Sequence, residues 1–232
     1  MTAAPRQLVL WDLDYTLLDP AGFGQHAIRS AFSELTGFSP PAGVLVAGRT
    51  DRAVIAEFIA ATDPALADRQ DDVQELAAKI AERRRHELRS RGGRALPGAA
   101  AAVEALAAHG DVVQSVLTGN LETIGRIKVG ELGLGRHLDL TIAAFGDAHT
   151  VRSSLVQTAR ARARERYGVH YEGHATVIIG DTPHDVEAAA AQGAFSIGVG
   201  TGQYSVEELS AVGADSVVPH LKDPEALLAA LP

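Results

Sequence analysis

Short apolar runs alternate along this chain with longer segments whose apolar residues recur at helical spacing. The apolar runs predict strands, and the periodic segments between them predict helices. Strands are expected at residues 8–11, 112–117, 138–142, 176–180, 195–199 and 215–219; helices are expected to begin near Leu121 and Ser153, to pass through Val186, and to close the chain at 224–231. Such alternation predicts an α/β fold with a parallel sheet covered by helices on both faces.

A long segment between the first two strands shows helical periodicity only. Its apolar residues follow helical spacing, and no alternating strand pattern occurs before Pro97 and Gly98. The segment is much longer than an ordinary loop. We therefore predict an α/β core domain formed by residues 1–20 and 97–232, with an all-helical cap domain at residues 21–96 inserted into it.

Two of the predicted strands end in pairs of carboxylates. Asp12 and Asp14 follow the run at 8–11, and Asp181 and Asp185 follow a second β-branched run. Side chains alternate along a strand, so Asp12 and Asp14 start on one side, at the sheet edge where open α/β folds bind ligands. An Asp-rich turn would explain the first pair alone equally well. The second acidic strand end favours a site that holds a divalent cation and supplies a nucleophile.

The predicted strand at 112–117 ends in neutral polar groups instead. Thr118, Gly119 and Asn120 stand directly before a predicted helix. A threonine hydroxyl and free backbone N–H groups at a helix N-terminus bind phosphate oxygens without any net charge of their own. This segment therefore predicts an anion-binding position.

Together these motifs resemble those of the haloacid dehalogenase (HAD) superfamily, in its phosphatase branch, close to phosphoglycolate phosphatase-like enzymes with a helical cap. Each motif is short, but their order and their positions at strand ends are specific together. The resemblance rests on Asp-x-Asp-x-Thr at Asp12, Asp14 and Thr16, on Thr118, and on Gly-Asp-x-x-x-Asp at Gly180, Asp181 and Asp185. It implies a HAD-like Rossmannoid core whose Asp12 strand lies between the strands that end at Thr118 and Asp181.

The resemblance also implies an activity and roles for these residues. It predicts a Mg²⁺-dependent phosphatase in which Asp12 is the nucleophile that becomes an aspartyl phosphate, and Asp14 is the general acid/base. Mg²⁺ prefers hard oxygen ligands, and the expected ligand positions are Asp12, the backbone carbonyl of Asp14, Asp181 and, through water or by orientation, Asp185. Substrate contacts are expected from Thr16, Thr118, Gly119 and Asn120.

The cationic motif of the family is less clear in this sequence. The family uses a Lys, occasionally an Arg, but no Lys occurs between Lys128 and Lys222. Arg152 is the strong cation in the expected stretch, and its planar fork suits phosphate, although Arg does not replace Lys neutrally. We predict Arg152 for this role. Lys128, on the helix after Thr118, is the alternative candidate, and an exposed helix cation would explain it equally well.

A segment of the predicted cap resembles the loop that related phosphatases lower over the catalytic strands. It comprises Gly48, Arg49, Thr50 and Asp51. Arg49 is expected to contact the leaving group of the substrate. Ordinary N-capping of the next helix by Thr50 or Asp51 would explain those two residues without a catalytic role.

Composition limits the partners of the protein. The formal net charge of −8 argues against nucleic-acid binding, which needs a basic surface. There is no cysteine, and no apolar run approaches the length of a membrane span. We expect a cytoplasmic protein that acts on a small phosphorylated metabolite, with no nucleic-acid or membrane partner. The sequence does not indicate an oligomeric state.

Four other functions compete with a phosphatase. A dehalogenase of the superfamily lacks the second aspartate of the pair, so Asp14 counts against it. A β-phosphoglucomutase-like phosphomutase shares every core carboxylate and differs in its product. A phospho-acceptor signalling module has no helical cap, so the predicted cap counts against it. A capped binding protein without turnover would keep clustered carboxylates at a cost in stability through mutual repulsion.

Overall fold

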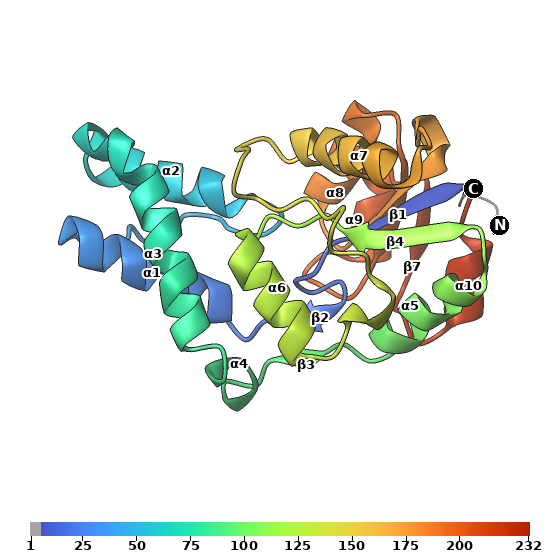
Figure 1. Ribbon diagram of the computed structural model, residues 1–232, viewed down its shortest axis with the longest axis horizontal. Helices are drawn as coiled ribbons and strands as arrows, with labels where there is room; N and C mark the ends of the chain where they lie inside the picture. The colour runs from blue at the N-terminus through green and yellow to red at the C-terminus, as the bar shows by residue number, and fades with distance from the viewer. Residues whose placement is uncertain (1–5) are drawn as a thin grey trace.

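The computed structural model describes residues 6–232 and contains one five-stranded parallel sheet. The strand order is β4-β1-β5-β6-β7, so the strand that leads into Asp12 lies between those that lead into Thr118 and Asp181, as predicted. The strands are β1 Gln7–Trp11, β4 Val112–Val116, β5 Thr176–Gly180, β6 Phe195–Val199 and β7 Ser216–Val218. Because all five run parallel, their carboxyl ends meet at one edge of the sheet (Figure 1).

Helices cover both faces of this sheet, which explains why β1 is an unbroken apolar run. Leu8 and Leu10 pack into one hydrophobic cluster, whereas Val9 and Trp11 pack into another on the opposite face. Figure 1 shows α7 and α8 on the first side, with α5 and α10 on the other. The core helices are α5 Ala99–Ala108, α6 Glu122–Glu131, α7 Ser153–Tyr167, α8 Pro183–Ala191, α9 Val206–Ala211 and α10 Pro224–Ala229.

The predicted strand at residues 138–142 is wrong. The chain there follows a short 3₁₀-helix, Gly135–His137, and runs beside β4 with a single bridge between Leu117 and Ala144. The Asp139 carboxylate accepts hydrogen bonds from the backbone N–H and the hydroxyl of Thr141, at 2.9 and 2.6 Å. This local turn competes with extended pairing, and it prevents a strand although apolar and polar residues alternate in the segment.

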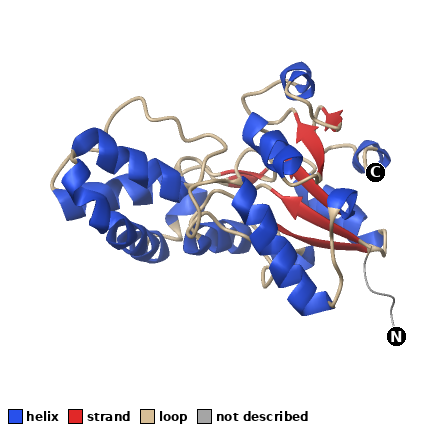
Figure 2. Ribbon diagram, turned by 90° about the horizontal axis from the view of Figure 1, so that it is seen from above, coloured by secondary structure: helices blue, strands red, loops and turns tan. Residues whose placement is uncertain are grey.

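A group of helices lies apart from the sheet, beyond the carboxyl end of β4 (Figures 1 and 2). These elements follow β1 and precede α5, where the sequence predicts the cap. They are α1 Phe23–Thr36, α2 Asp51–Thr62, the 3₁₀-helix Pro64–Arg69, α3 Gln70–Arg83 and α4 Glu87–Ser90. The segment that enters this helical group and the segment that leaves it pair as two short antiparallel strands, β2 Leu18–Asp19 and β3 Arg94–Ala95. The sequence did not indicate this pair. The boundaries of 21–96 for the cap stay our proposal, and the first five residues of the predicted core lie outside the described range.

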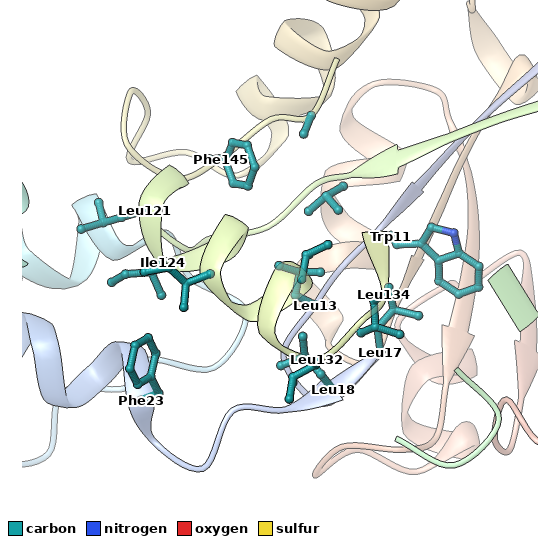
Figure 3. Packing of buried hydrophobic residues seen from close by; sticks show 14 of the residues in the cluster. Trp11, Leu13, Leu17, Leu18, Phe23, Leu121, Ile124, Leu132, Leu134 and Phe145 are labelled. Atoms are coloured by element: carbon teal, nitrogen blue, oxygen red, sulfur yellow. The ribbon is translucent and has the colours of Figure 1, made fainter. Parts of the chain in front are cut away.

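Helix α6 connects the sheet to this helical group. Figure 3 shows Ile124 of α6 and Leu132, the residue directly after α6, beside Leu13 and Leu18 of the segment after β1, with Phe23 of α1 close by. All of these side chains belong to one buried cluster. Within residues 6–232, no helix has the length and apolarity needed to cross a bilayer. The cytoplasmic location stays a prediction.

Candidate active site

The segment after β1 folds tightly enough to bring two carboxylates into one cavity. The backbone N–H of Asp12 donates to the carbonyl of Ile179 at 2.9 Å and so extends the pairing with β5. Tyr15 then adopts a left-handed conformation (φ 62°), which is uncommon for a residue other than glycine. Asp12 and Asp14 both line a cavity of about 540 Å³ between the core loops and the helical group.

Three carboxylates form a compact buried cluster at this sheet edge. One oxygen of each of Asp12, Asp181 and Asp185 lies within 4.8 Å of the others. The Thr16 hydroxyl donates to Asp181 at 3.0 Å, and the backbone N–H and hydroxyl of Thr182 donate to Asp185 at 3.1 and 2.7 Å. Burial, together with the neighbouring carboxylates, raises the pKa of Asp12 and of Asp181 well above the usual range. Clustered oxygens of this kind fit a hard divalent cation such as Mg²⁺.

Two glycines provide the space for this cluster. A Cβ atom at Gly180 would overlap the carboxyl group of Asp185, and one at Gly202 would overlap the carboxylate of Asp181. The glycine before Asp181 is therefore needed because Asp185 folds back against the end of β5. Gly202 belongs to the loop after β6, which the sequence did not assign to the site although β6 ends at the same sheet edge.

Arg152 joins the cluster to the loop of the cap. Its Nη2 donates to Asp12 at 2.8 Å and to Asp185 at 2.5 Å, and its Nη1 donates to the carbonyl of Gly48 at 3.1 Å. Burial by itself would lower the pKa of Arg152, but Asp185 and Asp12 raise it above its ordinary value. The structure thus brings Arg152 to the predicted nucleophile as a permanently charged group.

Lys128 occupies a different part of the cavity. Its Nζ lies 2.7 Å from each carboxylate oxygen of Asp14 and 2.5 Å from Oδ1 of Asn120. Its side chain is only 1% exposed, so the interpretation of Lys128 as an exposed helix cation is wrong. Lys128 and Arg152 are therefore not alternatives for one position, because each is paired with a different aspartate.

The predicted anion-binding segment lines the same cavity. The Thr118 hydroxyl oxygen accepts from the backbone N–H of Asn120 at 3.3 Å and from its side-chain amide at 2.8 Å. With its oxygen engaged as an acceptor, Thr118 has its own O–H available as a donor. Gly119 is required because a Cβ there would overlap the backbone carbonyl of Arg49.

In the loop of the cap, the Asp51 side chain bonds to the core, whereas the Arg49 side chain pairs within the cap. Arg49 lines the cavity but forms an ion pair with Glu57 at 2.5 Å. Thr50 N-caps α2 by accepting from the backbone N–H of Ala53 at 3.2 Å, as expected for a cap, and its hydroxyl donates to the carbonyl of Thr150 at 3.3 Å. Asp51 instead accepts from the backbone N–H of Leu121 at 2.8 Å, just before α6. Burial raises the pKa of Asp51 to about 7.

The predicted site residues therefore fall into three groups. One surrounds the cavity: Asp12, Asp14, Arg49, Thr118, Gly119, Asn120, Lys128, Arg152 and Asp181. Asp185 stands behind Asp12 and Arg152. Thr16, expected to contact the substrate, is fully buried with its hydroxyl on Asp181. Sequence reasoning missed the contact of Asp51 with α6, because an acidic residue in the first turn of α2 already has a local explanation.

Known proteins of this fold resemble the chain over nearly its full length. A predicted phosphatase from Clostridium acetobutylicum is 19% identical, with a TM-score of 0.69, and the match covers 97% of this chain and 100% of that one. CbbY from Rhodobacter sphaeroides, in complex with phosphate, is 19% identical with a TM-score of 0.69, covering 97% and 98%. A putative beta-phosphoglucomutase from Bacteroides vulgatus is 18% identical with a TM-score of 0.67, covering 99% and 91%. At these identities the likeness shows the fold alone.

The family itself is shown by a sequence match. No curated protein matches the chain. The family model of the haloacid dehalogenase-like hydrolases, however, matches residues 9–190, a span that contains the carboxylates after β1 and β5 and both buried cations. The chain therefore belongs to the haloacid dehalogenase-like hydrolases.

Proposed function

We propose that this protein is a Mg²⁺-dependent phosphatase that hydrolyses a small phosphorylated metabolite through a phosphoryl group carried on Asp12. One observation supports this function above the others. The Asp12 carboxylate belongs to the three-carboxylate cluster, accepts a hydrogen bond from Arg152, and shares a cavity with Asp14. A nucleophile, a cation site and an acid/base group are thus within one small volume.

The cation would be held by Asp12, Asp181 and Asp185. When bound, Mg²⁺ would neutralise these carboxylates and the charge of the phosphate. The fit is supported by the buried oxygen cluster, since three neighbouring carboxylates with a single Arg152 leave an excess of negative charge. Thr16 and Thr182 orient two of the carboxylates through their hydroxyls.

The chain's own residues carry the two chemical steps. First, a carboxylate oxygen of Asp12 attacks phosphorus, the ester P–O bond breaks, and the leaving oxygen takes a proton from Asp14. Second, Asp14 takes a proton from a water molecule, whose oxygen attacks phosphorus and breaks its bond to Asp12. Inorganic phosphate leaves, and both aspartates return to their starting states. A positioned acid/base group of this kind contributes about 10²- to 10⁴-fold to the rate.

The phosphoryl oxygens would be bound by neutral donors and one cation. The Thr118 O–H is available, and Arg152 adds positive charge beside Asp12. Arg49, on the cap side of the cavity, would face the leaving group. The cavity of about 540 Å³ between core and cap supports a small substrate.

The test is a panel of phosphate esters assayed with Mg²⁺ and with EDTA. We expect turnover that EDTA abolishes, a phosphorylated Asp12 detectable by mass spectrometry after acid quenching, and a loss of roughly 10³-fold or more in Asp12→Asn. Asp68→Asn, on the exposed surface of the cap, is the matched control. Chelator-insensitive turnover or an active Asp12→Asn variant would rule out the mechanism.

Product analysis separates the phosphatase from the phosphomutase. Release of inorganic phosphate in proportion to substrate consumed supports a phosphatase. An isomeric sugar phosphate without phosphate release would identify a phosphomutase. The neighbour from Bacteroides vulgatus, a putative beta-phosphoglucomutase, has a similar fold.

A further inference from the structure

Lys128 is buried in a way that uses all of its hydrogen-bonding capacity. A lysine ammonium has three N–H donors and no acceptor. In this structure three acceptors surround it: both carboxylate oxygens of Asp14 and Oδ1 of Asn120. No donor is left for a phosphate oxygen. Lys128 thus differs from a phosphate ligand, although it lines the active-site cavity.

The position of the ammonium is set by packing on both sides. Helix α6, which carries Lys128, is held by the buried contacts around Ile124 that Figure 3 shows. The first turn of α1 lies directly over the polar end of Lys128. A Cβ atom at Gly24 would be 3.5 Å from Nζ of Lys128, 3.5 Å from Oδ1 of Asn120 and 3.1 Å from Ile124. Water is excluded from this side, so the charge depends on its protein partners.

Asn120 completes the arrangement. Because its Oδ1 accepts from Lys128, its Nδ2 is directed to Thr118 at 2.8 Å and to Asp14 at 3.3 Å. Asp14 Oδ2 therefore has two donors, and Oδ1 has one. The side chain of Asp14 is 31% exposed, and without these donors its carboxylate would be free to rotate in the cavity.

We propose that Lys128 is a positioning residue that fixes the orientation of the Asp14 carboxylate for proton transfer, and that it does not bind the phosphate. The inference rests on the proposed function, because it assigns Lys128 a role in the step that Asp14 performs. Asn120 assists by fixing one carboxylate oxygen. Arg152, on Asp12, is then the cation next to the reacting phosphoryl group.

The test compares two esters that differ in their need for a proton. An alkyl phosphate has a poor leaving group and needs protonation by Asp14, whereas 4-nitrophenyl phosphate has a good leaving group and needs it little. The constant kcat/KM covers the steps up to phosphoryl transfer to Asp12. Lys128→Met removes the charge and keeps the stem. We expect it to lower kcat/KM about 100-fold for the alkyl ester and less than about 10-fold for the aryl ester.

Three further variants sharpen this result. Asp14→Asn should also lower kcat/KM more for the alkyl ester than for the aryl ester. The double variant Asp14→Asn with Lys128→Met should have a kcat/KM for the alkyl ester only slightly below that of Asp14→Asn alone, because both changes act on one step. Lys79→Met, an exposed lysine whose partner is Glu75, is the matched control and should leave the ratio of the two constants unchanged. An equal loss on both esters with a raised KM would overturn the proposal and make Lys128 a phosphate ligand.

A separate measurement checks that the Lys128→Met variant folds. Lys128→Met should keep a cooperative melting transition and its stabilisation by Mg²⁺. If it does not fold, Asn120→Ala removes the other anchor and should change the ratio in the same direction, by a smaller factor. An unchanged ratio in Asn120→Ala would then overturn the proposal. Failure of the proposed function would look different, because the wild-type protein itself would show no EDTA-sensitive turnover.

Discussion

The two halves of the candidate active site differ in how their charges are balanced. On the β5 side, the carboxyl groups of Asp12, Asp181 and Asp185 cluster, and Arg152 is paired with two of them, Asp12 and Asp185. On the α6 side, Asp14 alone is paired with the ammonium of Lys128. The first half gathers three carboxyl groups near one cation, whereas in the second one carboxyl group faces one cation and its hydrogen bonds are made within the protein.

This difference indicates which part of the site needs a ligand. Burial and mutual repulsion raise the pKa of Asp12 and of Asp181, which means that the metal-free protein does not readily hold all of these charges. A divalent cation would relieve that repulsion. The α6 side needs no such help, so the orientation of Asp14 is fixed by the fold before substrate binds.

Among substitutions that distinguish the two halves of the site, Arg152→Ala is expected to have the largest effect on kcat/KM. The substitution removes the cation that contacts Asp12 and leaves Asp185 with one fewer donor. We expect kcat/KM to fall by about 10²- to 10³-fold, as for the loss of one strong electrostatic donor. Arg164→Ala, at an exposed position of α7, the helix that follows Arg152, is the control. An unchanged kcat/KM would exclude Arg152 as the cation of the reacting phosphoryl group.

The second prediction separates the two halves directly. Saturating Mg²⁺, at about 100 times its dissociation constant, should stabilise the wild-type protein by about 2.7 kcal/mol and raise Tm by several degrees. Asp181→Asn should lose most of this shift in Tm. Asp14→Asn should keep it, because the Asp14 side chain is not part of the cluster. Equal shifts in both variants would show that the cation binds elsewhere.

The smallest effect is expected from Asp51, the cap residue that contacts the segment before α6. It concerns how the stability of the fold depends on pH. Burial raises the pKa of Asp51 to about 7; Lys128 lowers it, and Asp14 and Asp147 raise it. An acid whose folded-state pKa is raised stabilises the fold at low pH and loses that contribution as pH rises through the folded value. Wild-type stability should therefore decline between about pH 4 and pH 8 through this group.

Asp51→Asn tests this dependence. The asparagine Oδ1 can still accept from the backbone N–H of Leu121, but it cannot ionise. Denaturant unfolding at pH 5.5 and pH 8.5 should show that the variant loses about 2 kcal/mol less than the wild type over this interval. Asp68→Asn, at an exposed position, should follow the wild type. An identical pH dependence in Asp51→Asn and wild type would contradict the prediction.

Much of the core was predictable because it depends on local patterns. Apolar runs fix β1, β4, β5 and β6, and each is followed by the polar residues that line the cavity. The segment at 138–142 was not predictable in this way. Its apolar residues satisfy a strand pattern, but the turn formed by Asp139 and Thr141 prevails because side-chain acceptors compete with strand pairing.

The sequence by itself determined the order of the motifs, their places at strand ends and the membership of the HAD family. Only the tertiary structure decided the partners of the two cations. Lys128 and Asp14 are 114 residues apart, and the pattern of α6 does not show that α1 covers this face of the helix. Burial forces each charge to find an opposite charge. Which charges meet depends on how the helical segment packs against the core, and that information is not local in the sequence.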